Sequence, residues 1–445
     1  MKILIIYAPF CAPTMMPYSL ASMKHFVETH SDASVTCLDL NAYFHTLQFP
    51  EFYKRLKKED YASVLEDFDK TSRAVYAENN KKIVHGEEAA FVPELMERIL
   101  QEKADLVAFS FVYNSQCFYG HVLVDALLKR GIPCVLGGPA VTDKLHALAP
   151  VFSEKGLLDY LVTKGVVLKE IKNYVAVPDF SPFPKENYLS KERIISLKSS
   201  STCFYKQCTF CTHFARVPYA EYSLEHIREA LVKNKAKYVY FIDDMISKNR
   251  LLEIGKLMEE FSVQWWCQLR PTEDLLDCLE LLSQQGLRSV CWGVESGNQR
   301  ILDLMKKGTS VEGAKKVLAE SKRVGIINML YMLFAFPTET KEEFLASIDF
   351  LEKNKKNIDL VSTSVFGLQR GAKVYDDPQA YGILAVSERE RTLLPGVISY
   401  TVEKGLDNEE ARILLKNHVK QIKRLEKLPH VFNYFKEQTL LWKSS

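Results

Sequence analysis

Three cysteines stand close together in one short stretch of the chain, Cys203-Phe-Tyr-Lys-Gln-Cys208-Thr-Phe-Cys211. Thiolates are soft ligands that suit zinc or an iron–sulfur cluster, and three of them in one loop can face a single inorganic centre. Three ligands on a [4Fe–4S] cube leave one iron open, where a small chelating molecule could bind and receive an electron. The sequence therefore predicts a metal centre held by these three residues.

A structural zinc site is the alternative interpretation of the same loop. His213 lies two residues beyond Cys211, so a Cys3His zinc knuckle in a redox-inert binding protein uses the same residues. No fourth cysteine or histidine stands at the C-x2-C return spacing that closes many structural zinc sites. The two interpretations differ in their metal, their colour and their redox chemistry.

The elements that position this loop are predicted from a repeated alternation of strands and helices between residues 193 and 366. Apolar runs indicate strands at 194–199, 238–242, 263–269, 289–294, 328–336 and 360–365, and the segments between them have the spacing of amphipathic helices. This alternation is typical of parallel strands with outer helices, here a partial (β/α)6 barrel. In barrels the chemistry lies at the carboxyl ends of the strands.

Polar residues gather at the predicted strand ends. Asp243 and Asp244 follow the second strand, Arg270 the third, and Glu295-Ser296 the fourth. Burying an unpaired charge is costly, so such groups should meet a ligand, a cation or water. A structural ring of ion pairs among Asp243, Arg270 and Glu295 is the alternative. These strand ends carry no histidines, so they do not favour a zinc-dependent barrel hydrolase.

The cysteine loop and two later segments, GVESGNQRILDLMKKGTS and FAFPTET, resemble the radical S-adenosylmethionine (SAM) superfamily. The usual loop spacing there is C-x3-C-x2-C, so this chain carries one extra residue. The resemblance implies that Cys203, Cys208 and Cys211 ligate a [4Fe–4S] cluster whose fourth iron chelates SAM, which is cleaved reductively to a 5′-deoxyadenosyl radical. It also implies SAM contacts, listed here: Phe210, Asp244, Arg270, Glu295, Ser296 and Phe336.

The first part of the chain, residues 1–177, alternates buried strands and helices and predicts a doubly wound parallel sheet of Rossmann type. Its segments ILIIYAPF, PYSLASM and GGP resemble the cobalamin-binding-like domain that precedes many radical SAM cores. The resemblance implies cobalamin contacts at Asn114, Gly137 and Gly138, and methyl transfer from cobalamin to an unactivated carbon of a natural product or peptide.

One motif of that domain is missing. The family pattern D-x-H-x-x-G supplies a histidine ligand to cobalt, but this chain reads Asp39-Leu40-Asn41-Ala42-Tyr43-Phe44. We interpret the nearby His45 as a surface or helix-packing residue. The sequence therefore leaves two interpretations, one with bound cobalamin and one without. The second is a cobalamin-free radical SAM enzyme that rearranges, epimerises or cross-links its substrate. In that case the first domain is a structural or substrate lid.

Further boundaries come from composition. A helical insertion is predicted at about 44–103, and the stretch FVPELMERILQEKADLVAFSFVYNSQ, which begins inside it at Phe91, weakly resembles radical SAM maturases of ribosomal peptides. A proline-rich linker is predicted at 178–190, the radical SAM barrel at 191–368, and a helical C-terminal region at 369–445. The basic stretch 411–427 predicts a packed helix with a solvated face, or a dock for an acidic peptide. No cysteine follows Cys291, which argues against an auxiliary cluster domain.

Charge and cysteine usage limit the kinds of partner that we expect. The 445 residues carry 58 basic and 56 acidic side chains, a net charge of +2, which gives no reason to expect nucleic-acid binding. No apolar run is long enough for a membrane span, and no signal peptide is apparent. Most of the ten cysteines sit singly in apolar segments, which fits reduced thiols in the cytoplasm. The resemblance further implies a small-molecule or peptide substrate and an electron donor such as flavodoxin or ferredoxin.

Overall fold

The computed structural model of the chain describes residues 1–170, 176–213 and 217–442. Contacts between residues divide the chain into two compact units. The first unit comprises residues 1–195 with the short segments 229–235 and 390–396. The second comprises the rest, and each unit is described by itself.

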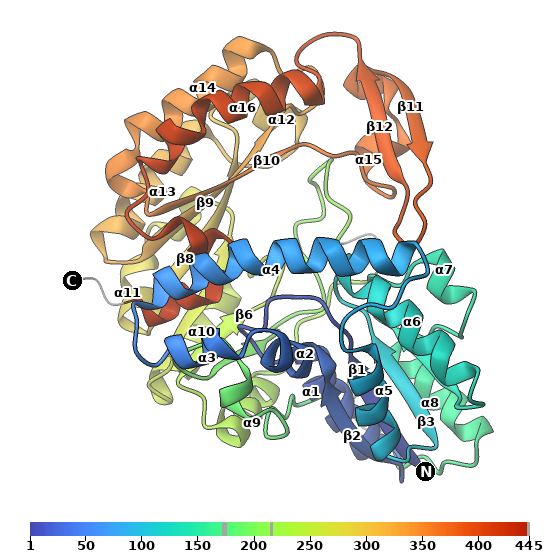
Figure 1. Cartoon of the computed structure of the whole chain (residues 1–445). Coiled ribbons are helices and arrows are strands. Elements are labelled where there is room, and N and C mark those ends of the chain that lie inside the picture. Colours follow the sequence, from blue (N-terminus) through green and yellow to red (C-terminus); the bar gives the residue numbers. More distant parts are fainter. Residues whose placement is uncertain (171–175, 214–216, 443–445) are drawn as a thin grey trace. The chain divides into compact units, whose positions relative to one another are not determined.

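The first unit is built on a four-stranded parallel sheet in the order β2-β1-β3-β4 (Figure 1). Its strands are β1 (Lys2–Tyr7), β2 (Ser34–Asp39), β3 (Leu106–Ser110) and β4 (Cys134–Gly137). Ile3, Leu4 and Ile6 of β1 are fully buried because this strand is flanked on both edges. The predicted parallel α/β sheet is confirmed.

Helices connect the strands of the first unit. They are α1 (Tyr18–His30), α2 (Leu40–Gln48), α3 (Pro50–Arg55), α4 (Tyr61–Val84), α5 (Val92–Gln101), α6 (Cys117–Leu128), α7 (Asp143–His146) and α8 (Glu154–Thr163). Between β2 and β3 the chain is helical, and the long helix α4 stands out in this stretch (Figure 1). Asp39 ends β2 and also caps α2, because its carboxylate accepts a hydrogen bond from the Ala42 N–H.

The second unit contains a six-stranded parallel sheet in the order β10-β9-β8-β7-β6-β5. The strands are β5 (Ile194–Leu197), β6 (Tyr238–Phe241), β7 (Gln264–Leu269), β8 (Leu287–Glu295), β9 (Ile327–Phe334) and β10 (Leu360–Val365). Strand order follows chain order, as expected for a βα-repeat barrel that does not close. All six predicted strands are present, so this part of the predicted fold is confirmed.

The helices between these strands are α9 (Leu224–Asn234), α10 (Lys248–Glu260), α11 (Leu279–Gln284), α12 (Gln299–Leu304), α13 (Val311–Arg323) and α14 (Lys341–Lys353). In α10 the predicted apolar stripe is buried at Leu251, Ile254 and Met258, which have no exposed surface. The helices thus connect successive parallel strands, as in a βα-repeat barrel.

The C-terminal region is only partly helical, so the expectation of helices alone there is corrected. After α15 (Lys373–Asp376) the antiparallel strands β11 (Ile383–Arg389) and β12 (Val397–Val402) form a hairpin, drawn in orange-red in Figure 1. Val386, Val397 and Ile398 are β-branched, which favours strands over helices. The helix α16 (Asn408–Lys423) follows, and it leaves Ile413 and Val419 exposed.

Candidate radical SAM site

The cysteine loop begins after β5 and is held mainly through its backbone. The Thr209 N–H donates to the Met305 carbonyl at 2.9 Å, and the Val374 N–H donates to the Thr209 carbonyl at 3.1 Å. The Thr209 hydroxyl adds a bond of 3.1 Å to the Leu304 carbonyl at the end of α12. The middle of the loop is therefore fixed to two separate segments of the second unit.

The three thiols are free and lie near one another. Cys208 is buried, and Cys203 and Cys211 are partly exposed. Burial raises the pKa of Cys208 and raises the pKa of Cys211 to about 11, and the neighbouring thiols act in the same direction. In the part of the chain that the structure describes, no three His, Cys, Asp or Glu side chains are grouped to hold a single metal ion. The donor set fits an iron–sulfur cluster, in which thiolates bind separate irons.

His213 pairs with Asp244 at the other end of the loop. The His213 Nδ1 lies 2.5 Å from the Asp244 Oδ1, and the Thr202 hydroxyl donates to Asp244 Oδ2 at 3.4 Å. The hydrogen bond to the carboxylate raises the pKa of His213. Burial alone would raise the pKa of Asp244, but the bond and charge of His213 lower it. Asp244, three residues after the end of β6, thereby contacts the loop.

The neighbouring carboxylate Asp243 has a different role. It is 3% exposed and accepts hydrogen bonds from the Ser199 N–H and from the hydroxyls of Ser199 and Ser200, all within 3.0 Å. Burial raises its pKa. With these partners, Asp243 braces the chain leaving β5, whereas Asp244 contacts the loop.

Arg270 stacks on the cysteine loop. Its guanidinium lies 3.5 Å from the centre of the Tyr205 ring, and its Nη1 donates to the Lys307 carbonyl at 2.7 Å. The Arg270 Nε is buried without a hydrogen-bond partner. A buried donor without an acceptor is an expected contact point for an anionic ligand group.

Gly308 makes this stacking possible. It has a φ of +67°, and a Cβ at this position would lie 2.1 Å from the Tyr205 hydroxyl and 2.8 Å from Arg270 Nη1. The Tyr205 hydroxyl donates to the Lys306 carbonyl at 3.0 Å, which closes the contact. Only glycine allows both the left-handed turn and the close approach of the ring.

Glu295 forms a buried ion pair that the sequence analysis did not predict. Its Oε1 lies 2.7 Å from Lys307 Nζ, and the two side chains are 11% and 8% exposed. Glu295 has a φ of +67° at a register shift between β8 and β9, which turns its side chain out of the regular strand pattern. Burial alone would lower the pKa of Lys307, but the Glu295 carboxylate raises it.

Lys307 lies in the segment DLMKKGTS, whose two lysines look alike in sequence. Lys306 is exposed, whereas Lys307 is buried and its Nζ lies 5.7 Å from the centre of the Phe210 ring. The glycine that follows, Gly308, was a sequence signal for a turn after α12. Such a turn directs one of the two lysines toward the interior. The predicted ring of ion pairs among Asp243, Arg270 and Glu295 is not formed, since each has a different partner.

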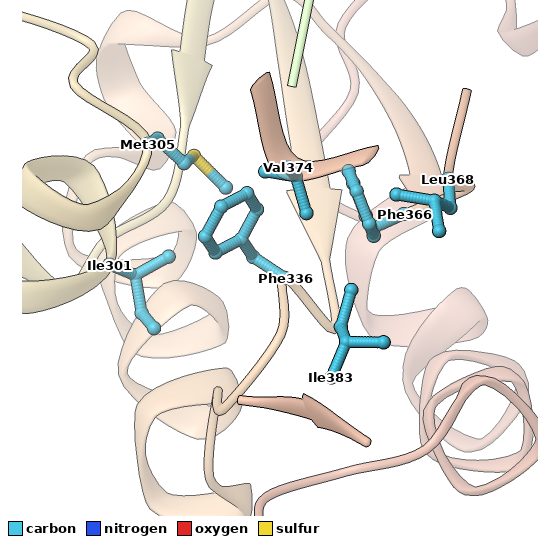
Figure 2. Close-up of a cluster of buried hydrophobic side chains, with 7 residues drawn as sticks. All are labelled: Ile301, Met305, Phe336, Phe366, Leu368, Val374 and Ile383. Atoms are coloured by element: carbon cyan, nitrogen blue, oxygen red, sulfur yellow. The ribbon is translucent and has the colours of Figure 1, made fainter. Parts of the chain in front are cut away.

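Two other predicted SAM contacts lie in packed surroundings. The Ser296 hydroxyl is fully buried, lies 3.2 Å from the Ser347 hydroxyl, and accepts from the Asn298 N–H at 3.1 Å. Phe336 is fully buried in an apolar cluster, which Figure 2 shows; its members are Ile301, Met305, Phe336, Phe366, Leu368, Val374 and Ile383. Phe210 packs against this cluster. These assignments stay predictions.

Around the cysteine loop, the structure thus brings together Phe210, Asp244, Arg270 and Glu295. Each is joined to the loop either directly or through one neighbour, as the bonds above describe. Ser296 and Phe336 stand behind this group as packing residues. The arrangement offers a cationic and a carboxylate side chain next to three thiols.

The predicted cobalamin contacts lie at strand ends of the first unit. Gly137 ends β4, and Gly138 follows with a φ of +102°; a Cβ there would lie 2.2 Å from the Phe111 carbonyl oxygen. Asn114 is exposed at the start of a short 3₁₀ turn, Asn114–Gln116. The assignment of these residues to cobalamin also stays a prediction, because none of their contacts identifies a ligand.

The structure corrects the surface interpretation of His45, which is fully buried in α2. Its Nδ1 lies 2.6 Å from the Asn41 carbonyl and its Nε2 contacts the Tyr76 hydroxyl. Burial lowers its pKa to about 4. His45 is therefore a packing residue. Asn41, which takes the place of the cobalt-ligating histidine, accepts from the Cys11 N–H at 2.8 Å.

Residues 197–351 match the model of the radical SAM superfamily. The match covers the cysteine loop and the strand ends described above. A [4Fe–4S] cluster and SAM are the cofactors that a radical SAM segment implies, and the three thiols and the buried Arg270 Nε donor fit them.

Individual proteins extend this comparison. An uncharacterized methyltransferase of Pyrococcus horikoshii is 22% identical over 189 residues, which span 40% of this chain and 41% of that protein. The cobalamin-dependent SAM radical enzyme OxsB, solved with aqua-cobalamin and SAM, superposes with a TM-score of 0.64 at 13% identity, over 98% of this chain and 70% of that one. The radical SAM methyltransferase TsrM of Kitasatospora setae superposes with a TM-score of 0.59 at 14% identity. The superposition covers 95% of this chain and 88% of TsrM.

The likeness to OxsB and TsrM shows that this chain shares their fold over 98% and 95% of its length. Among the described residues, no helix combines the length and apolar composition needed to cross a membrane.

Proposed function

We propose that this radical SAM protein binds a [4Fe–4S] cluster through Cys203, Cys208 and Cys211 and cleaves SAM reductively to functionalise an unactivated carbon. The observation that supports this most is the loop itself, with three free thiols fixed by backbone bonds at the carboxyl end of β5. A reduced cluster supplies the electron for SAM cleavage in this superfamily. An electron donor such as flavodoxin or ferredoxin would then be a partner.

The chain's own side chains would bind and orient SAM. Arg270 has a buried, unused Nε donor that suits a carboxylate. Glu295 is held by Lys307, so its carboxylate keeps a fixed direction toward a hydroxyl or ammonium group. Asp244 stays ionised because His213 lowers its pKa. These residues would hold SAM in one orientation, which limits the positions that a radical can attack.

We further propose that the first unit binds cobalamin and that the reaction is transfer of a methyl group to carbon. OxsB and TsrM have this fold and were solved with cobalamin. Gly137 and Gly138 lie at the end of β4, where ligands of parallel sheets bind, and the left-handed φ of Gly138 lets the chain turn there against the Phe111 backbone. Because Asn41 takes the place of the histidine in the family pattern, cobalt would have no histidine ligand from this position.

Two observations favour the cobalamin-free alternative. Asn41 is already bonded to the Cys11 N–H, and the chain lacks the glycine of the family pattern. In that case the first unit would serve as a structural or substrate lid, and the outcome would be rearrangement, epimerisation or cross-linking of a small molecule or peptide.

Anaerobic reconstitution tests both proposals, the [4Fe–4S] cluster with SAM cleavage and the binding of cobalamin. Wild-type protein should take up about four irons with the brown colour of a cluster and release 5′-deoxyadenosine from SAM, and the Cys203→Ser/Cys208→Ser/Cys211→Ser variant should do neither. Unchanged iron content in that variant contradicts the cluster proposal, and one bound zinc without colour supports the zinc knuckle. Gel filtration with hydroxocobalamin then decides the second proposal, because no retained corrinoid contradicts the methyl transfer.

A further inference from the structure

The segment at the end of α12 is bonded to the cysteine loop and to β7 through its backbone. The carbonyl groups of residues 304–307 all accept hydrogen bonds from outside the segment. The first two accept from the hydroxyl and the N–H of Thr209, and the third accepts from the Tyr205 hydroxyl. The fourth accepts from Arg270 Nη1 at 2.7 Å. These donors replace the partners that the last carbonyls of a helix lack, so the segment and the loop form one fixed unit.

This segment places the charge of Lys307 in the interior. The Lys307 side chain is buried, and its Nζ lies 2.7 Å from the Glu295 Oε1 and 5.7 Å from the centre of the Phe210 ring. Phe210 lies two residues after Cys208, inside the cysteine loop. Gly293 leaves room for the ammonium group, because a Cβ there would lie 2.7 Å from the Lys307 Nζ. The cation is therefore held beside the loop.

The charges around the loop act on the Cys208 thiol, which is the buried one of the three. Burial raises the pKa of Cys208, and the charges of Lys307 and Arg270 lower it. The Glu295 carboxylate raises it, with a weaker influence than either cation. Burial alone would lower the pKa of Lys307, and Glu295 and Cys208 both raise it. The ammonium group thus has a carboxylate and a proposed cluster ligand as its neighbours.

These charges matter because a cluster at this loop would itself be an anion. A [4Fe–4S]2+ core with three thiolates carries one net negative charge, and reduction by one electron adds a second. The reduction potential of an iron–sulfur cluster depends on the charge around it. A buried cation nearby stabilises the reduced state more than the oxidised state, because it attracts the added electron. A buried carboxylate has the opposite effect.

We propose that Lys307 raises the reduction potential of the cluster bound at the cysteine loop, and that Glu295 limits this rise. The inference rests on the proposed function, because it requires the cluster. One segment would then have two tasks. Its backbone holds the loop in place, and its Lys307 side chain makes it easier for the electron donor to pass one electron to the cluster.

Potentiometric titration of the reconstituted protein tests the sign of this effect. Iron content is determined first, and the reduced cluster is then followed by electron paramagnetic resonance in the absence of SAM. Lys307→Met should lower the midpoint potential by at least about 59 mV, which is a tenfold change in the ratio of reduced to oxidised cluster. Glu295→Gln should raise the midpoint potential, because the ammonium group then acts without its carboxylate.

The opposite signs separate an electrostatic role from a structural one. Damage to the loop would move both variants in the same direction, and such a result overturns the proposal. Lys307→Arg keeps the charge and should have a midpoint potential near that of the wild type. Lys306→Met, at the exposed neighbouring lysine, is the matched control and should leave the potential unchanged.

A double variant keeps the test decisive where Lys307→Met alone holds no cluster. Lys307→Met/Glu295→Gln has neither charge of the pair, and it differs from Glu295→Gln only at residue 307. Its midpoint potential should lie at least about 59 mV below that of Glu295→Gln. Equal potentials in these two proteins, with a complete cluster in both, overturn the role of Lys307.

The iron content distinguishes a failure of this inference from a failure of the proposed function. Wild-type protein that takes up no cluster overturns both, because Lys307 would then have no cluster to act on. A complete cluster of about four irons with the same potential in every variant overturns the role of Lys307 alone. That result leaves the cluster proposal standing.

Discussion

At the scale of single residues, the buried ion pair between Glu295 and Lys307 should be sensitive to substitution. Replacing Lys307 by Met leaves the Glu295 carboxylate buried without its partner. We expect a loss of roughly 3–5 kcal/mol in the free energy of unfolding. Lys306→Met, at the exposed neighbouring lysine, should change it by less than about 0.5 kcal/mol. Chemical denaturation of both variants measures the difference, and equal losses would contradict the pairing.

Glu339, which follows β9, gives a prediction for pH dependence. It is fully buried, its Oε1 has no hydrogen-bond partner, and its Oε2 accepts from the Ala335 N–H. Burial raises its pKa to about 8. The proton is thus held more tightly in the folded state, so its stabilising effect is complete below the unfolded pKa, near 4.3, and is lost as the pH rises through 8.

The matched variant for this titration is Glu339→Gln, which keeps an oxygen for the Ala335 N–H and cannot ionise. Its stability relative to the wild type should increase between about pH 5 and pH 8. Urea denaturation at several pH values measures the difference between the two proteins. A difference that stays constant over this range would show that Glu339 titrates normally.

At the scale of elements, the turn after α12 supports the cysteine loop through Gly308. Gly308→Ala combines a left-handed φ with a clash against the Tyr205 hydroxyl. The control is Gly325→Ala, at a φ of +84° with open space around the added Cβ. We expect about 1–3 kcal/mol of destabilisation in the control and clearly more in Gly308→Ala, together with reduced iron uptake only in the latter. Similar iron uptake in both would contradict the coupling.

The elements themselves were largely predictable, and the reasons are physical. Continuous apolar runs predicted β6 to β10 because parallel strands are buried on both faces. The hairpin β11–β12 was missed because only one of the seven β11 residues is buried, so no two-residue apolar period marks it. In α16 the periodicity predicted the helix, but not that Ile413 and Val419 would stay exposed.

Residue type and spacing were enough to propose Cys203, Cys208 and Cys211 as ligands, and that assignment stays a prediction. The position of a side chain in the site could not be predicted where neighbouring residues are of the same type. Lys307 cannot be told from Lys306 by type. Asp243 and Asp244 are adjacent, and only the structure separates the bracing carboxylate from the one facing the loop.

At the scale of the whole molecule, the balance of charges makes a prediction about partners. With a net charge of +2 over 445 residues, the chain has no general electrostatic attraction for polyanions. Filter binding with bulk transfer RNA should show no retention at micromolar protein and about 150 mM salt. Retention that falls steeply with salt would instead indicate a local basic surface and a nucleic-acid substrate.

The way the sulfur donors are anchored has a consequence for how this protein can vary. Thr209 is fastened to Met305 and Val374 by main-chain atoms, whose capacity to bond is the same for almost any amino acid. Many side chains in the surroundings could therefore be exchanged without moving the proposed inorganic centre, as long as the tight contact at Gly308 is kept. Its location would stay constant between related proteins while the selectivity and redox behaviour around it diverge.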